Sequence, residues 1–164
     1  MNADRQKKFK AIIDRYGDNI YRIALLHTRN NMDAQDIVQE VFLKYAKAEK
    51  NFDSDEHIKA WLIRATINMC IDLNRSAWSS RASKLNDNII EADETGGGES
   101  SLRSAVMQLP EKYKNVIHLF YYDDYSIKEI AYITNQNEGT IKMQLSRARS
   151  LLKNILKGEP DYEL

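Results

Sequence analysis

The sequence predicts an all-α protein in which two small helical domains are joined by a flexible linker. Apolar residues recur at three- and four-residue steps from end to end, and patterns that alternate as in a strand are absent. Only two prolines occur, and this spacing stops in one polar segment that contains three consecutive glycines. We therefore assign residues 1–80 to a first domain, 81–101 to the linker, 102–158 to a second domain and 159–164 to a frayed tail.

Composition excludes several classes of protein. The chain has 24 Lys and Arg residues and 24 Asp and Glu residues, so its formal net charge is zero. We therefore expect any DNA contact to be confined to a local surface and to depend partly on a partner. The single cysteine, Cys70, excludes an internal disulfide, and the three scattered histidines join no cysteine cluster, so we expect no metal and no cofactor. The polar N-terminus predicts no secretory signal, and Arg64 and Asn68 interrupt the most apolar stretch, residues 61–71. We expect a cytoplasmic protein that is not embedded in a membrane.

The first domain begins with packing helices. Residues 4–30 predict one or two amphipathic helices with a break near Gly17. Asp33 is then expected to cap a helix whose buried side is apolar: Ile37, Val38, Val41, Phe42 and Tyr45. The outer side of that helix displays Asp36, Gln39, Glu40 and Leu43. Such an acid and amide face is most often a solvated surface, so it does not by itself indicate a binding site.

A polar loop, residues 49–56, precedes a helix expected over residues 57–76. Its inward side is predicted to consist of Ile58, Leu62, Ala65, Met69 and Leu73. Its other face carries Trp61, Arg64, Asn68, Asp72 and Arg75. That face is either the edge of a core helix or a platform for unstacked bases, because aromatic rings and Arg stack on any base.

The second domain starts with a helix for which Pro110 suits the first turn. We expect this helix to run to about Tyr122 and to end at residues 123–124. Ser126 and Glu129 then form a capping box, in which each side chain satisfies a backbone N–H at the start of a short helix.

The segment after this short helix completes a helix-turn-helix pattern. Residues 134–137 are polar, and Asn137 is expected to cap a longer helix whose buried stripe is Ile141, Leu145, Ala148, Leu152 and Ile155. The opposite face carries Thr140, Met143, Arg147 and Ser150, flanked by Lys142, Gln144 and Arg149. Residues 139–157 include five Lys or Arg and no acid. A basic second helix after a short capped one predicts DNA binding in the major groove.

Several short motifs stand in order along the chain. The first domain contains DAQDIVQEVFL at residues 33–43, and KAWL at 59–62 followed by Asn68, Asp72 and Arg75. The second domain contains LPEKY at 109–113, YSIKEIA at 125–131, GTIK at 139–142 and LSRAR at 145–149. Each motif alone is weak, but the ordered set with a linker between resembles the extracytoplasmic-function group of bacterial RNA polymerase sigma factors over nearly the whole chain.

This resemblance implies a promoter-specificity subunit with no catalytic residue of its own. Its expected partners are core RNA polymerase, through the coiled coil and the flap of the large subunits, promoter DNA and an anti-sigma factor. The polymerase-binding residues would be Asp36, Gln39, Glu40 and Leu43. Melted minus-ten DNA would contact Asn51, Phe52, Asp53, Trp61, Arg64, Asn68, Asp72 and Arg75. Duplex minus-thirty-five DNA would contact Thr140, Lys142, Met143, Gln144, Ser146, Arg147 and Arg149.

One departure from the family pattern concerns the DNA-reading helix. Many relatives carry Lys-Ser-Arg where this chain has Lys142, Met143 and Gln144. The contact of the missing Arg is therefore not carried over, and Gln144 would favour adenine if it reaches a base.

Three other classes of protein compete with this interpretation. A helix-turn-helix regulator explains the second domain but leaves the first without a sensory pocket or a clear dimer face. A helical enzyme around Asp33, Asp36, Glu40 and His57 lacks a nucleophile, base and oxyanion donor in one place. An interaction scaffold is the remaining class. A regulator or an enzyme has no reason to co-purify with core polymerase in equal amounts, whereas a sigma factor does.

Overall fold

The computed structural model describes residues 3–80 and 97–158, and every regular element within those ranges is a helix. The chain divides into two compact units, Met1–Ile89 and Ile90–Leu164. The prediction of an all-α protein with two helical domains is therefore confirmed. Residues 81–96 of the expected linker and the expected tail, residues 159–164, lie outside the described residues.

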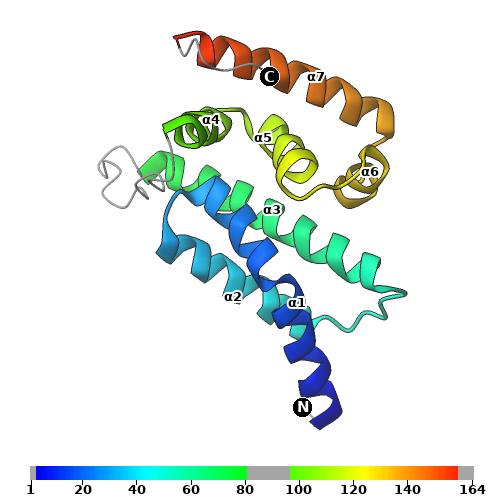
Figure 1. The fold of residues 1–164 in the computed structure, drawn as a ribbon. Helices are drawn as coiled ribbons and strands as arrows, with labels where there is room; N and C mark the ends of the chain where they lie inside the picture. The colour runs from blue at the N-terminus through cyan, green and yellow to red at the C-terminus, as the bar shows by residue number, and fades with distance from the viewer. Residues whose placement is uncertain (1–2, 81–96, 159–164) are drawn as a thin grey trace. The chain divides into compact units, whose positions relative to one another are not determined.

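The described part of the first unit consists of α1 (Ala3–Thr28), α2 (Asn31–Lys47) and α3 (Asp55–Ser80). α2 runs back alongside α1, and α3 lies against both (Figure 1). Each helix contributes apolar side chains to one core, which is formed by Ile20, Ile23, Ala24, Leu26, Ala34, Ile37, Val41, Phe42, Ala60, Leu62, Ile63, Ile67 and Cys70. Of the side predicted to be buried in α2, Ile37, Val41 and Phe42 are buried, whereas Val38 and Tyr45 are only half-buried. The single cysteine, Cys70, is a buried member of this core.

α1 passes through Gly17 without interruption, so the expected break at this residue is wrong. A glycine inside a helix costs about 1 kcal/mol relative to alanine. Packing on both sides of Gly17 offsets this cost, because Phe9 meets the ring of Phe42 at 6.5 Å and Ile20 and Ile23 are buried.

Replacing Gly17 by alanine is expected to raise the free energy of unfolding by about 0.4–1 kcal/mol, because alanine has fewer unfolded conformations to lose. A Cβ atom at this position would meet the Cγ2 atom of Ile13 at 3.9 Å, an ordinary van der Waals contact. Urea unfolding should show a higher midpoint with an unchanged slope. A lower midpoint would contradict the assignment of Gly17 to an uninterrupted helix.

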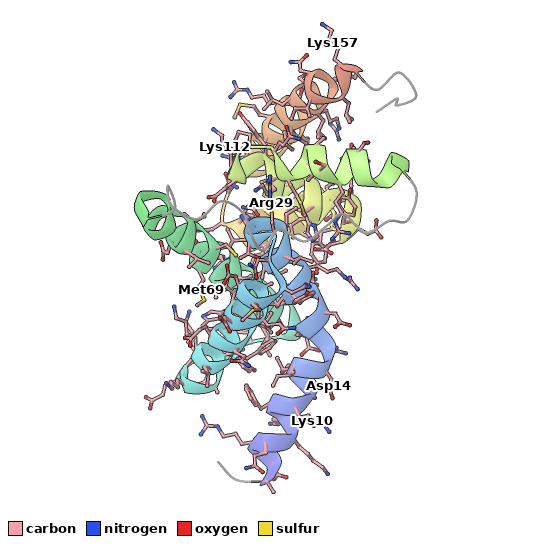
Figure 2. All side chains as sticks on the ribbon, turned by 90° about the vertical axis from the view of Figure 1, so that its left-hand side faces the viewer. Lys10, Asp14, Arg29, Met69, Lys112 and Lys157 are labelled. Atoms are coloured by element: carbon pink, nitrogen blue, oxygen red, sulfur yellow. The ribbon has the colours of Figure 1, made fainter. Side chains whose placement is uncertain are left out.

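The chain turns from α1 into α2 at Arg29, whose φ of 57° is left-handed (Figure 2). Asn30 then caps α2, since its side chain accepts a hydrogen bond of 3.1 Å from the backbone N–H of Asp33. The expectation that Asp33 caps this helix is therefore wrong. Asp33 lies in the first turn instead, where its charge still interacts favourably with the helix dipole. Asn and Asp cap helices about equally well, so the place where α1 ends selects Asn30.

α3 begins at Asp55 rather than at residue 57, because Ser54 caps it. The Oγ atom of Ser54 accepts a hydrogen bond of 3.1 Å from the backbone N–H of His57. The helix also continues to Ser80, beyond its expected end at residue 76.

The buried side of α3 differs from the expected one. Leu62 is buried as predicted, but Leu73 is 38% exposed, and Ile58, Ala65 and Met69 are only half-buried. The residues buried in their place are Ala60, Ile63, Thr66, Ile67 and Cys70. α3 is apolar over a wide arc, and its contact with both α1 and α2 decides which part of that arc is covered.

The first described element of the second unit is a helix that the sequence did not predict. α4 (Gly97–Met107) includes residues 97–101, which were expected to belong to the linker. Its C-terminal part buries Ala105 and Val106, and the helix packs against the elements that follow it. The sequence did not predict α4 because its start is rich in glycine, which disfavours a helix in isolation.

The other described elements of the second unit follow in close succession (Figure 1). They are α5 (Glu111–Ile117), the π-helical turn η2 (His118–Tyr122), α6 (Ile127–Thr134), α7 (Glu138–Ile155) and the 3₁₀ turn η3 (Leu156–Gly158). The helix expected to run to about Tyr122 is thus present as α5 and η2. Pro110 precedes its first residue as the N-cap, rather than lying within the first turn.

The predicted caps of α6 and α7 are both confirmed. Ser126 and Glu129 form the capping box of α6, with both hydrogen bonds at 3.0 Å. The Oδ1 atom of Asn137 accepts a bond of 2.7 Å from the N–H of Thr140 at the start of α7. The predicted stripe of α7 is buried except at its end, where Ile155 is 36% exposed and Leu156 of η3 is buried instead. Among the described residues, no helix is both long enough and apolar enough to cross a membrane.

Candidate functional site

One candidate surface is the outer face of α2. The four residues expected to bind a partner here, Asp36, Gln39, Glu40 and Leu43, are all exposed, and Leu43 is 48% exposed. Met32, four residues before Asp36 and 71% exposed, lies on the same face by its helical spacing. Met32 was not among the residues predicted from the sequence, although its step of four from Asp36 could have indicated it. The face therefore offers acidic groups between two apolar side chains.

A cluster of aromatic rings holds the loop between α2 and α3. The rings of Phe9 and Tyr45 stack at 6.2 Å, and Tyr45 meets Phe52 at 5.4 Å and Trp61 at 5.9 Å. Phe52 and Trp61 meet edge to face at 5.9 Å. Burial, with smaller contributions from Asp55 and Tyr16, raises the pKa of Tyr45, so its hydroxyl stays neutral. Phe52 and Trp61, which the sequence analysis assigned to DNA, are thus half-buried members of this cluster.

The loop itself carries exposed polar side chains, and its backbone is hydrogen-bonded to the start of α3. The Nδ1 atom of His57 accepts a hydrogen bond of 3.2 Å from the backbone N–H of Asp53, and the His57 ring packs against Phe52 at 5.0 Å. Asn51 and Asp53 are exposed. Arg15 of α1 binds Asp55 at 2.7 Å across the start of α3, and this hydrogen bond raises the pKa of Arg15. The loop thus presents Asn51 and Asp53 from a fixed position beside the aromatic cluster.

The outer face of α3 continues from this loop along the helix. Asn68 and Asp72 are exposed, and Trp61 and Arg64 are half-buried. Helical spacing places these four residues on one side, so the structure brings them together as expected. The side chain of Arg75 lies outside the described residues.

The outer face of α7 is the third candidate surface. Lys142, Met143, Ser146 and Arg147 are exposed, and Thr140 is half-buried beside the cap. α6 and α7 pack on each other through the buried Ile130, Ile133, Ile141 and Leu145. A basic helix is therefore held on its inner side and open on its outer side, as the second helix of a helix-turn-helix requires.

Gln144, which would favour adenine if it reaches a base, is not exposed on this outer face. Its side chain is 7% exposed, and its Nε2 atom donates a bond of 3.0 Å to the Oε1 atom of Gln136 in the turn. Gln136 in turn donates to the hydroxyl of Thr134 at 3.0 Å, and that hydroxyl donates to the carbonyl of Ile130 at 2.7 Å. Gln144 therefore joins the turn to α7.

Arg149 is held by two aromatic residues of η2. Its Nε atom donates a hydrogen bond of 2.6 Å to the hydroxyl of Tyr121. Its guanidinium carbon lies 5.6 Å from the ring centroid of Tyr121 and 6.0 Å from that of Phe120. Tyr121 was not among the residues predicted from the sequence, because 28 residues separate it from Arg149 and no local pattern connects them.

Comparisons with known proteins match both units of the chain. The chain matches the family models for Sigma-70 region 2 over residues 12–80 and for Sigma-70 region 4 over residues 99–152. It is 32% identical over 145 residues to RNA polymerase sigma factor SigV of Bacillus subtilis (strain 168), which covers 86% of each chain. It is 29% identical over 169 residues to ECF RNA polymerase sigma factor SigW of the same organism, which covers 93% of this chain and 90% of that protein.

Two solved structures share the fold. The sigma factor RpoE in complex with the anti-sigma factor NepR, from Bartonella quintana, has a TM-score of 0.71 at 24% identity and covers 93% of this chain and 99% of that chain. CnrH in complex with the cytosolic domain of CnrY also has a TM-score of 0.71 at 24% identity, and covers 94% of this chain and 90% of that chain.

Proposed function

The chain belongs to the sigma-70 family of bacterial RNA polymerase sigma factors, in its extracytoplasmic-function group, and we propose how its surfaces divide the work of promoter recognition. The protein is a promoter-specificity subunit that binds core polymerase and directs transcription initiation. The observation that carries this proposal is a basic, outward-facing α7 behind a capped turn, in one chain with a region 2 unit. Such a chain can join DNA and polymerase.

The outer face of α2 is proposed to bind the coiled coil of the polymerase large subunit. Asp36 and Glu40 supply negative charge for a basic partner, and opposite charges at an interface speed encounter and fix orientation. Met32 and Leu43, exposed at the two ends of the face, would contribute apolar contact. Region 4 is proposed to meet the polymerase flap.

The loop before α3 and the outer face of α3 are proposed to hold melted minus-ten DNA. Asn51 and Asp53 can bind the edges of unstacked bases, and Trp61 and Arg64 offer surfaces for stacking. The aromatic cluster is proposed to keep the loop in position before DNA arrives, which lowers the entropy lost on binding. Asn68, Asp72 and Arg75 would extend this surface along the helix.

The outer face of α7 is proposed to read the minus-thirty-five element as duplex. Arg147 lies seven residues after Thr140, two turns along the same side, so both can face the groove with Met143, while Ser146 lies toward the flank. Arg can form a bidentate contact with guanine. Lys142 lies on one flank of this face and is proposed to contact phosphate.

Two alanine substitutions should separate these roles. Arg147→Ala should cost about 1–3 kcal/mol of promoter binding and relax the preference at one base position, whereas Lys142→Ala should weaken all sequences alike. The measurement is transcription by holoenzyme from a promoter with a randomised upstream element, followed by sequencing of the transcribed templates. An unchanged preference for Arg147→Ala would remove this residue from the base-reading set.

The proposed role as a whole is tested with core polymerase. The chain should elute with core enzyme in equal amounts and should start run-off transcription at defined sites. A helix-turn-helix regulator would bind DNA without doing either, so failure of both tests would favour that alternative. The role requires no catalytic residue in this chain, because core polymerase performs the chemistry, and it places the protein in the cytoplasm with the chromosome.

An anti-sigma factor is proposed as the regulatory partner. Both solved structures described above are complexes, one of them named as a complex of a sigma factor with an anti-sigma factor. A protein that covers the α2 face or the α7 face would block polymerase or DNA binding.

A further inference from the structure

We infer that Tyr121 positions Arg149 as a phosphate clamp at the flank of the DNA-reading helix. This inference rests on the proposed function of α7 and concerns a residue outside the motifs of that helix. It assigns Arg149 to the DNA backbone and not to base reading. The contacts of Arg149, its place on α7 and the chemistry of its guanidinium group each support it.

The first observation is the way in which Tyr121 and Phe120 hold the guanidinium group. The Nε atom of Arg149 donates to the Tyr121 hydroxyl at 2.6 Å, and both rings lie within 6.0 Å of the guanidinium carbon. The rings meet each other edge to face at 4.9 Å and 84°. Tyr121 is 50% exposed and Arg149 is half-buried, so this site is at the surface of the second unit. A long, flexible side chain is thus held in one orientation.

The second observation is that the hydrogen bond to Tyr121 uses the Nε atom of Arg149. Guanidinium has N–H donors on Nε and on both terminal nitrogens. Since Tyr121 accepts from Nε, the terminal nitrogens remain to form the paired hydrogen bonds that Arg makes with phosphate. The Tyr121 hydroxyl, which accepts from Nε, still has its own hydrogen to donate to the same phosphate.

The third observation is the position of Arg149 on the helix. Lys142, Ser146, Arg149 and Lys153 recur at steps of four, three and four residues, so they form one row along α7. Arg147 is two residues before Arg149 and therefore points to a different side of the helix. A helix in the major groove has a DNA backbone beside it, and a basic row on its flank is suited to that backbone.

Holding Arg149 in place should favour DNA binding by reducing the entropy cost. An unrestrained Arg side chain loses rotamer entropy when it is fixed. Tyr121 has already fixed this side chain in the free protein, so less is lost when phosphate binds. The gain does not depend on the base sequence, because every base pair has the same phosphates.

The test is a double-mutant cycle with the full chain assembled with core polymerase. Its variants are Tyr121→Phe, Arg149→Ala and the two combined. The probe is a promoter fragment with a randomised upstream element, and the readouts are affinity at several salt concentrations and the sequences bound. Tyr121→Phe keeps the ring and removes only the hydroxyl. Tyr122→Phe is the matched control, since Tyr122 is 48% exposed and stacks on His118.

Arg149→Ala should weaken binding about 10-fold for all sequences and reduce the salt slope by about 1. Tyr121→Phe should weaken binding about 3-fold without changing sequence preference, and should have no further effect when Arg149 is already alanine. Tyr122→Phe should leave affinity unchanged. Equal losses from Tyr121→Phe with and without Arg149 would overturn the inference, as would a change in base preference.

The result also separates this inference from the function on which it rests. If Arg149→Ala has no effect while holoenzyme still transcribes from defined start sites, the clamp is wrong and the proposed function stands. If the chain does not bind core polymerase, the proposed function itself fails. Thermal unfolding of each variant reports a purely structural role, because a loss of affinity that follows a loss of folded protein would overturn the positioning role.

Discussion

The double substitution Asp36→Lys and Glu40→Lys is expected to lower the affinity for core polymerase by about 100-fold or more. Both side chains are exposed on the outer face of α2, so neither supports the core of the first unit. Like charges brought together at an interface cost several kcal/mol, whereas exposed substitutions usually change stability by less than about 0.5 kcal/mol. The measurements are the dissociation constant for core enzyme and the urea midpoint of the free chain.

A matched control is available on α1. Asp14 and Asp18 are also exposed and four residues apart, and Asp14 points away from the neighbouring helices (Figure 2). Asp14→Lys with Asp18→Lys makes the same change in net charge, and we expect it to preserve polymerase binding. Equal affinities for the α2 variant and the unaltered chain would remove this face from the interface. Equal losses for both double variants would show an effect of net charge alone.

Gln144→Arg is expected to destabilise the second unit by about 2–4 kcal/mol. The substitution removes the hydrogen bond to Gln136 and places a charge at a position that is 7% exposed. A buried charge without a partner is costly, and an Arg that leaves this position exposes the space that Gln144 filled. The loss should appear as a lower urea midpoint for the second unit, and as lower transcription without a change in promoter preference.

Met143→Arg is the control, because it introduces the same charge at the neighbouring position. Met143 is 44% exposed, so an added charge at this position remains in water and should change stability by less than about 0.5 kcal/mol. Equal urea midpoints for the two variants would contradict the buried role of Gln144. A shifted promoter preference for Gln144→Arg at unchanged stability would indicate that the side chain at this position contacts DNA.

Features that depend on a few neighbouring residues were predicted correctly. The capping box of Ser126 and the Asn137 cap each involve residues three apart, so the pattern that predicts the hydrogen bond also contains both partners. The exposed face of α2 follows from helical spacing in the same way. The functional roles of these surfaces came instead from the ordered motifs, because an acidic or basic helix face has the same local pattern whether it binds a partner or water.

The errors occur where several local solutions have similar energies. Asn30 and Asp33 are both able to cap α2, and the end of α1 selects Asn30. α3 is apolar around much of its circumference, and its contact with α1 and α2 buries Ile63 and Ile67 rather than Leu73. Packing energy added across helices exceeds the small differences in propensity that a local pattern reports.

By itself, the sequence determined that this protein is all-helical, that it has two domains and that the second carries a capped helix-turn-helix. Those properties depend on spacing and caps, which act over three or four residues. Only the tertiary structure decided that Gln144 faces the turn and that Tyr121 holds Arg149. Each of these two contacts joins side chains from different elements, 8 and 28 residues apart. Packing of α7 against its neighbours brings the two side chains of each pair within hydrogen-bond distance. No periodicity in the sequence predicts such a pair, because the partners belong to different elements.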